Sequence, residues 1–204
     1  MLKRLISSML LTLCCITMMA QGASYQQAIS KFRNSAGETA TVTRVTHKSA
    51  LKEDKRDKGS LWMKKPGKVC ISVNKGKDKL IMNGFTFTMV INGKKHVTNA
   101  KTNAQFTTFE KVFESILSGG ANGVNIENLP GVSVAKQGGK VIIKIVPMTG
   151  KKQRGILFSS FELTIDTQTS ALKTLRMNQR KGNYTEYQFS GFQFNQKVAD
   201  NVFQ

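Results

Sequence analysis

Short stretches of alternating apolar and polar residues, bounded by turn residues, make up most of the chain. Alternation places successive side chains on opposite faces of a strand, so each stretch predicts a strand with one apolar face. Asn83-Gly84 is the strongest turn signal, because both residues tolerate the positive φ of a tight hairpin. The predicted strands cover residues 39–47, 59–65, 68–73, 79–82, 85–91, 132–134, 140–146, 156–166, 172–179 and 184–194. Many short strands at hairpin spacing indicate an antiparallel meander that curls towards a barrel.

Two segments have a helical period instead. Residues 24–34 predict a short helix, and residues 106–117 predict a longer amphipathic helix that ends at Gly119-Gly120. The longer helix either covers one face of the sheet permanently or acts as a lid that can move, and the pattern leaves both open. Six apolar side chains trace one side of it: Phe106, Phe109, Val112, Phe113, Ile116 and Leu117.

The N-terminus has the layout of a secretory signal peptide. Lys3 and Arg4 precede an apolar run over residues 5–20, and small residues follow. The run is short for a membrane span, although a retained anchor is the alternative. We expect residues 1–20 (to about 23) to be removed as a signal peptide. Residues 24–204 are then expected to form a single domain, and the protein is expected to be periplasmic.

Cysteine and charge usage narrow the class of partner. Cys14 and Cys15 lie inside the apolar run, where lipidation is not expected, and Cys70 alone would remain in the mature chain. The full chain carries 31 basic and 12 acidic residues, a net charge of +19. Export argues against nucleic acid as a partner, so anionic lipid head groups or an acidic protein face are better candidates. A basic surface without a dedicated partner is the alternative.

The sequence has no pattern typical of an enzyme. His47 and His96 are the histidines of the chain, and both lie beside charged residues where surface positions are expected. The charge cluster at residues 52–58 predicts a solvated hairpin loop. No cluster of histidine, cysteine and acidic residues has the spacing of a metal site, and no glycine-rich stretch continues into a phosphate loop. We therefore expect no catalysis, no cofactor and no metal.

The segment Gly59-Ser60-Leu61-Trp62-Met63-Lys64-Lys65-Pro66 is similar to a segment of the periplasmic outer-membrane lipoprotein carriers, the LolA-like family. The order of the predicted elements resembles that family as well. So do several C-terminal segments, at residues 163–166, 172–175, 181–185, 189–195 and 200–203. The resemblance covers nearly all of the mature chain. It implies an α+β fold: an antiparallel β half-barrel, or incomplete barrel, with helices closing the concave face.

The resemblance also implies a function. Such a carrier takes acylated lipoproteins from an inner-membrane lipoprotein-releasing ABC transporter to an outer-membrane acceptor, and we expect it to be a monomer. The residue before the motif's proline is typically an arginine that tethers the lid in the empty state. Here it is Lys65, whose compact ammonium would form a weaker lid tether. A solvated charge at a strand end is the alternative for Lys65.

Acyl chains cost roughly 0.8 kcal/mol per methylene in water, so a carrier needs an apolar container. Strand alternation places Leu61, Met63 and Lys65 on the concave face and Trp62 on the convex face. A carrier or sensor of free anionic lipid or glycolipid is the alternative function, and it would account better for the positive charge. The acyl-binding cavity is expected to be lined by Val45, Leu61, Met63, Phe85, Phe87, Met89, Phe109, Phe113 and Ile116.

Overall fold

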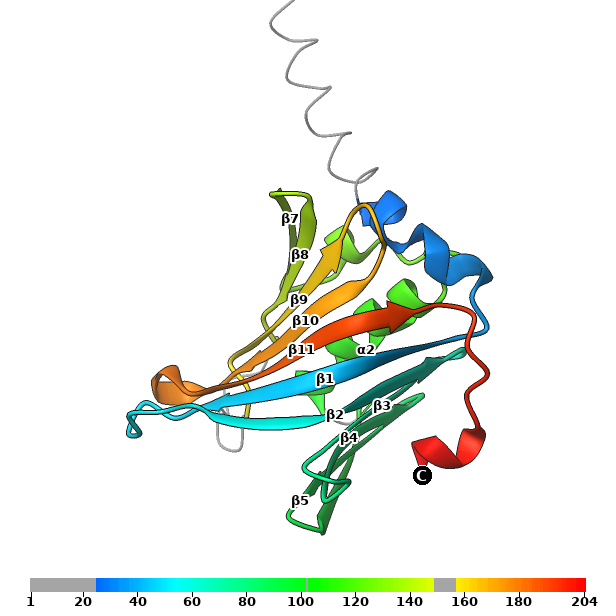
Figure 1. The fold of residues 1–204 in the computed structure, drawn as a ribbon. Coiled ribbons are helices and arrows are strands. Elements are labelled where there is room, and N and C mark those ends of the chain that lie inside the picture. Colours follow the sequence, from blue (N-terminus) through cyan, green and yellow to red (C-terminus); the bar gives the residue numbers. More distant parts are fainter. Residues whose placement is uncertain (1–24, 102, 149–156) are drawn as a thin grey trace, which may run out of the picture.

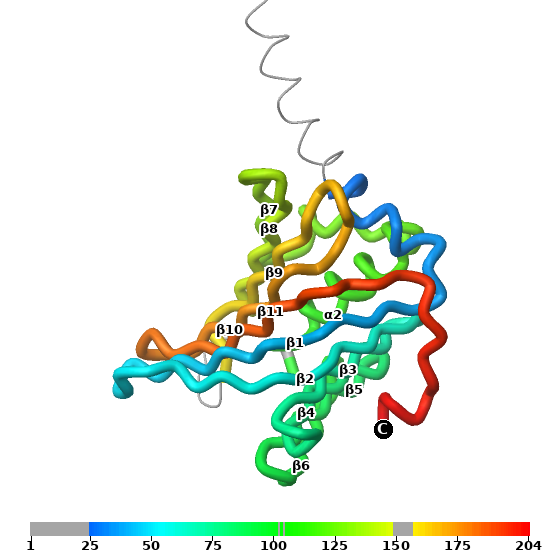
Figure 2. The backbone as a smooth tube through the Cα atoms, viewed as in Figure 1, coloured from blue at the N-terminus to red at the C-terminus, as the bar shows by residue number. Residues whose placement is uncertain are grey.

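A computed structural model of the protein describes residues 25–101, 103–148 and 157–204, so the predicted signal peptide lies outside the described residues. Its strands are β1 (Gly37–His47), β2 (Lys55–Lys64), β3 (Lys68–Val73), β4 (Asp78–Asn83), β5 (Thr86–Ile91), β6 (Lys94–Asn99), β7 (Val132–Gln137), β8 (Lys140–Ile145), β9 (Ser160–Asp166), β10 (Leu172–Asn178) and β11 (Tyr184–Gln193). They form one 11-stranded antiparallel sheet in the order β6-β5-β4-β3-β2-β1-β11-β10-β9-β8-β7 (Figures 1 and 2). The sheet curls but does not close, because β6 and β7 remain edges. The predicted half-barrel is confirmed.

Several strand bounds differ from the sequence prediction, as at β7 and β9, and the differences at β2 and β6 have clear physical causes. β2 begins at Lys55, so half of the predicted charged loop is strand, and Asp57 pairs directly with Arg44 of β1. β6 was not predicted, because its sequence has no apolar face: most of its residues are exposed at the edge of the sheet. Tertiary pairing, rather than local alternation, fixes both strands.

Helix α2 (Ala104–Leu117) lies across the concave face of the sheet (Figure 1). The Asn103 side chain caps its first turn by accepting a hydrogen bond from the backbone N–H of Gln105. Gly119 ends it with a positive φ, and a Cβ there would lie only 2.4 Å from the backbone nitrogen of Arg33. Both the turn and this close approach therefore require glycine. The six apolar residues predicted on one side of the helix are all buried.

Short helical segments complete the fold. Residues 25–29 are helical and continue into the 3-10 helix η1 (Ser30–Asn34), which reproduces the predicted N-terminal helix. Further 3-10 turns are η2 (Ile126–Asn128), η3 (Arg180–Gly182) and η4 (Asp200–Phe203). No helix among the described ranges is both long and apolar enough to cross a membrane.

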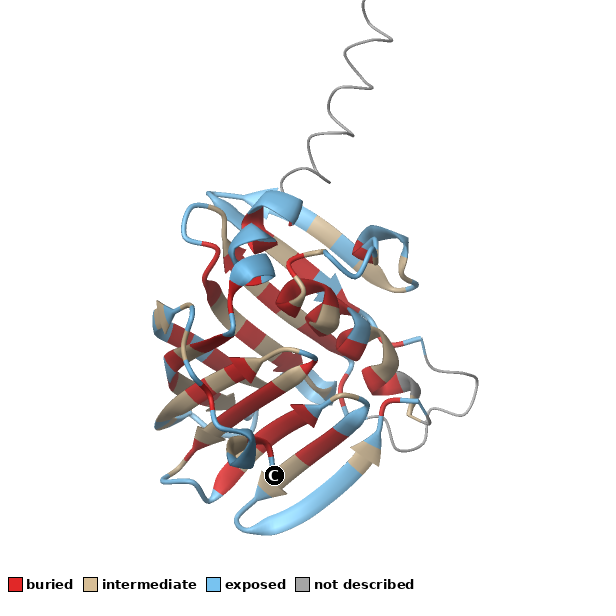
Figure 3. Ribbon diagram, turned by 90° about the vertical axis from the view of Figure 1, so that its right-hand side faces the viewer, coloured by how far each residue is buried: buried red, intermediate tan, exposed pale blue. Residues whose placement is uncertain are grey.

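The main core fills the space between the concave face and α2, and buried residues alternate with exposed ones along the strands (Figure 3). Phenylalanine rings dominate it. Phe87 stacks on Phe106 with ring centroids 4.4 Å apart, and Phe109 lies 4.6 Å from Phe161. Such pairs add stabilisation beyond the area they bury.

A smaller apolar cluster lies on the convex face. Cys70 and Ile81 pack there with Val198 and Phe203, and Trp62 packs against them. The chain after β11 crosses the outside of the sheet to bring η4 over this cluster (Figure 1). The position of Trp62 follows from the alternation along β2, because Leu61 and Met63 point into the main core.

Candidate ligand-binding site beneath helix α2

Most of the residues predicted to line a cavity lie together between the sheet and α2. Leu61 and Met63 of β2 pair with Ile71 and Val69 of β3, and their side chains are fully buried. Seven of the nine predicted residues belong to the main core or pack against it: Leu61, Met63, Phe87, Met89, Phe109, Phe113 and Ile116.

The other two lie elsewhere, which corrects their predicted placement. Phe85 is 45% exposed at the end of the β4–β5 hairpin, where the Lys101 ammonium lies 4.1 Å from its ring centroid. Val45 is buried but lies outside the main core. Arg44 points to the concave face, so Val45 is one residue out of phase and faces the other side of β1.

The space beneath α2 is almost filled by the protein's own side chains. A gap of about 10 Å³ remains, which is near the size needed for one water molecule. Every side chain around it is apolar: Val69, Ile71, Leu80, Met82, Phe87, Phe109, Phe113 and Leu175. A ligand larger than water can therefore enter only if the lining side chains, or α2 as a whole, move.

Few polar contacts hold α2 in place. The Tyr25 hydroxyl donates to Ser115 Oγ at 3.0 Å. Near the first turn, Gln105 Oε1 accepts the backbone N–H groups of Leu157 at 2.9 Å and Phe158 at 3.1 Å. At the other end, Arg33 Nη2 donates to the carbonyl oxygen of Gly119 at 3.1 Å. These contacts join α2 to the N-terminal helical segment and to the segment before β9.

Lys65 contacts η1 rather than α2. Its Nζ donates to the carbonyl oxygens of Phe32 at 3.2 Å and Arg33 at 2.8 Å, at the end of η1 where carbonyls attract a cation. Arg33 in turn bonds Gly119 beyond the end of α2. The expectation that Lys65 tethers the lid is therefore corrected in its detail: the contact with α2 runs through η1.

Glu38 is a buried acid near this junction that the sequence interpretation missed. It is 1% exposed on β1, opposite Met63, and one of its carboxylate oxygens has no hydrogen-bond partner among the described residues. Burial raises its pKa to about 7, although Ser35 and Lys65 act to lower it. Its position in phase with Ala40 and Val42 was the signal that it points inward.

The two histidines lie on different strands, His47 on β1 and His96 on β6. Nδ1 of His47 lies 2.7 Å from the Asp54 carboxylate, and its ring stacks on Tyr184. His96 is exposed on β6. In the described part of the chain, no group of three histidine, cysteine or acidic residues could hold a metal ion.

Comparison with known proteins identifies the family. The model of "Outer membrane lipoprotein carrier protein LolA" matches residues 35–204. No curated protein sequence matches the chain.

Solved structures that match this chain include a putative outer membrane lipoprotein-sorting protein domain from Vibrio parahaemolyticus (10% identity, 91% of this chain and 96% of that one, TM-score 0.47). A LolA superfamily protein from Nitrosomonas europaea is 6% identical over 90% of this chain and 97% of that one, with a TM-score of 0.41. Lipoprotein LppX from Mycobacterium tuberculosis is 12% identical over 88% and 97%, with a TM-score of 0.39. Because the family model spans well over half of the chain, the protein belongs to the LolA family of outer membrane lipoprotein carrier proteins.

Proposed function

We propose that this protein carries the acyl chains of lipoproteins through the periplasm, in a cavity that opens between α2 and the concave face of the sheet. The observation that carries the proposal is the all-apolar boundary between α2 and the sheet, which encloses about 10 Å³ in the closed state. Family membership supports it. In this proposal the lipoprotein-releasing ABC transporter of the inner membrane donates the cargo and an outer-membrane acceptor receives it. The protein acts as a monomer without catalysis.

The energetics favour such an exchange. Exposing one long acyl chain to water costs on the order of 10 kcal/mol, and this cost drives the chain into an apolar container. Movement of α2 away from the sheet would expose phenylalanine side chains to water, and the bound acyl chain would cover them again. Methionine is unbranched and flexible, so it refills irregular space after the cargo leaves. Met63, Met82 and Met89 lie on the concave strands and suit this role.

Capture of a fluorescent palmitoylated peptide tests the proposal. Phe113→Asp and Phe87→Asp place a charge in the boundary, and we expect each to reduce capture at least tenfold. Val97→Asp is the control, because Val97 is 59% exposed on β6. Since a buried aspartate can unfold the protein, Val69→Phe is a second variant that fills the gap with apolar volume. Undiminished capture by the folded variants would remove the proposed cavity.

Identification of the natural cargo separates the proposal from its alternative. Native mass spectrometry of the protein purified from the periplasm should detect an acylated protein bound to it. Detection of a free anionic lipid or glycolipid alone would instead favour the carrier or sensor of free lipid.

A further inference from the structure

A larger recess opens at the end of the sheet where β1 runs into the β1–β2 connection. Its volume is about 400 Å³. Lys55, at the start of β2, lies in the wall of the recess, and Lys65, just after the end of β2, contacts η1. They lie ten residues apart, so the recess and η1 lie about 30 Å apart along β2. The lining residues come from β1, β2, β4, β5, β10 and β11, from segments next to these strands and, for Phe158, from the segment before β9.

The inner wall of this recess is continuous with the main core. Leu80 lines both the recess and the gap beneath α2. Phe158 and Met177 belong to the core and also face the recess. The backbone N–H of Phe158 bonds Gln105 in the first turn of α2, so movement of this turn would connect the recess with the gap.

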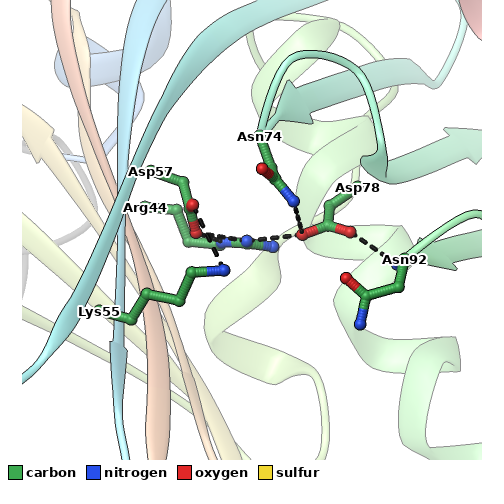
Figure 4. Close-up of polar contacts among 6 residues, drawn as sticks. All are labelled: Arg44, Lys55, Asp57, Asn74, Asp78 and Asn92. Atoms are coloured by element: carbon green, nitrogen blue, oxygen red, sulfur yellow. Dashed lines mark hydrogen bonds and ion pairs between the residues drawn. The ribbon is translucent and has the colours of Figure 1, made fainter.

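The floor of the recess is a buried ion network (Figure 4). Arg44 of β1 donates to the Asp57 carboxylate and, at 2.6 Å, to Asp78 of β4. Asp78 also accepts the backbone N–H of Asn92 at 2.7 Å. In a flat sheet β1 and β4 would be about 14 Å apart, so this contact requires strong curvature. The network holds this end of the sheet curled.

The four charged side chains at and beside the floor neutralise one another. A ligand would therefore meet mainly the other polar residues of the recess. Arg44 in the floor and the exposed Lys55 in the wall carry two positive charges, and Asp57 and Asp78 carry two negative ones. Burial acts to raise the pKa of Asp78, but the hydrogen bonds from Asn92 and Arg44 lower it overall, so the carboxylate stays ionised. The remaining polar residues of the lining can each donate a hydrogen bond: Thr46, His47, Lys48, Lys79, Asn92, Gln179, Asn183, Thr185 and Tyr187.

Polarity falls along the concave face from the recess inward. The paired residues Thr46 and Thr185 come first, Arg44 and Tyr187 follow, and the next inward row is apolar. That row pairs Val42 with Phe189, both buried. On β2 the same direction runs from Lys55 through Asp57 to Leu61 and Met63. An amphipathic ligand fits this gradient with its polar part in the recess.

The opposite end of the core is plugged. The ring of Phe32 in η1 is fully buried and packs edge-on against Phe192 at 6.0 Å and Phe194 at 5.1 Å. Lys65 fastens η1 over this end. The two ends therefore differ: aromatic rings seal one, and a polar recess opens at the other.

We propose that the recess is the mouth of the acyl site and binds the polar neck of the cargo. This inference rests on the proposed acyl-carrying function. The acyl chain passes Leu80 towards α2, and the neck stays in the recess. Its acceptor oxygens, in glyceryl esters and amides or in a phosphate group, meet the donors of Lys48, Thr46 and Thr185.

The position of the neck is tested with a palmitoylated peptide that carries a fluorophore on its polar end. A quencher is attached to Leu51→Cys at the recess or to Lys31→Cys near η1; Cys70 is buried and stays unlabelled. We expect several-fold stronger quenching from position 51. Stronger quenching from position 31 would overturn the inference and leave the carrier function standing. A probe that binds neither labelled protein nor the unlabelled one would overturn the function itself.

A second experiment tests the recess by filling it. Thr185→Trp should slow capture at least tenfold, whereas Gln188→Trp, on the exposed face of the same strand, should leave it unchanged. Equal capture by both variants would overturn the inference.

Two probes then distinguish the neck chemistries: monopalmitoyl glycerol, and monopalmitoyl glycerol phosphate. If Lys48→Gln weakens only the second probe, and Lys136→Gln on β7 weakens neither, the recess recognises phosphate. If Thr185→Trp weakens both probes and Lys48→Gln weakens neither, it recognises the ester neck.

Discussion

Glu38 places an ionisable carboxyl in a buried position on β1, with Ser35 and Lys65 as its polar neighbours. Its pKa is about 7 in the folded protein and about 4.5 in the unfolded chain, and burial is the main cause. Between these values the folded protein binds more protons than the unfolded chain does, so Glu38 lowers stability as the pH rises. We expect Glu38→Gln to raise the free energy of unfolding by less than about 1 kcal/mol at pH 5 and by about 3 kcal/mol at pH 8.

Urea unfolding at the two pH values checks this expectation. All other titrating groups are common to the wild type and the variant. The difference between their free energies of unfolding therefore reports on Glu38 alone. The same gain at pH 5 and pH 8 would mean that Glu38 is already ionised in the folded protein at pH 5.

At the scale of the element, α2 depends on contacts that pass through η1. Lys65→Met removes the ammonium that binds the Phe32 and Arg33 carbonyls. Because the ammonium is partly exposed, we expect a loss of about 1 kcal/mol in the closed state. Hydrogen exchange over residues 104–117 should then become about fivefold faster. Lys136→Met is the control, and uniform acceleration across β9 and β10 would indicate general destabilisation instead.

The turn η4 protects the convex cluster. Phe203 is 3% exposed and covers Cys70, whose pKa burial raises to about 11. The thiol should therefore react slowly with a disulfide reagent. Phe203→Ala should lower the free energy of unfolding by about 3 kcal/mol and speed modification of Cys70 at least tenfold. Unchanged reactivity in the variant would show that η4 does not control access to the thiol.

Elements with a local period were predictable from the sequence. The amphipathic pattern of residues 106–117 and the Asn83-Gly84 turn each specify a structure without help from distant residues. β6 was not predictable, because edge pairing with β5 stabilises it and its own sequence has no apolar face. The start of β2 depends on Asp57 meeting Arg44, which only the folded sheet brings together.

The candidate site was predictable in its composition and less so in its geometry. Alternation identified the inward residues of β2 and β5, but Val45 fell one residue out of phase and Phe85 lies at a hairpin end. That Lys65 bonds η1 rather than α2 depends on how the N-terminal segment folds back across the sheet. Sequence also cannot tell a cavity from a filled core, because the same apolar residues form both.

At the scale of the whole molecule, the open sheet leaves its concave face covered by a helix that is not bonded into the sheet. The strands of a closed barrel would be bonded on every side, whereas here α2 covers one face and is held mainly by apolar packing. In the proposed carrier, the bond of Arg44 to Asp78 would keep β1 and β4 together across the curve while α2 moves. The sheet would then serve as the fixed half and the helix as the moving half.

This division predicts the kinetics of acyl binding. The closed protein offers about 10 Å³ beneath α2, so opening must precede entry of the chain. In stopped-flow mixing with a fluorescent palmitoylated peptide, the observed association rate should therefore level off at high probe concentration, at the opening rate of α2. Lys65→Met should raise this plateau about fivefold, in line with its effect on the closed state. Lys136→Met should leave it unchanged. An association rate that keeps rising linearly would mean that the chain enters without waiting for the helix, through a cavity that is already open.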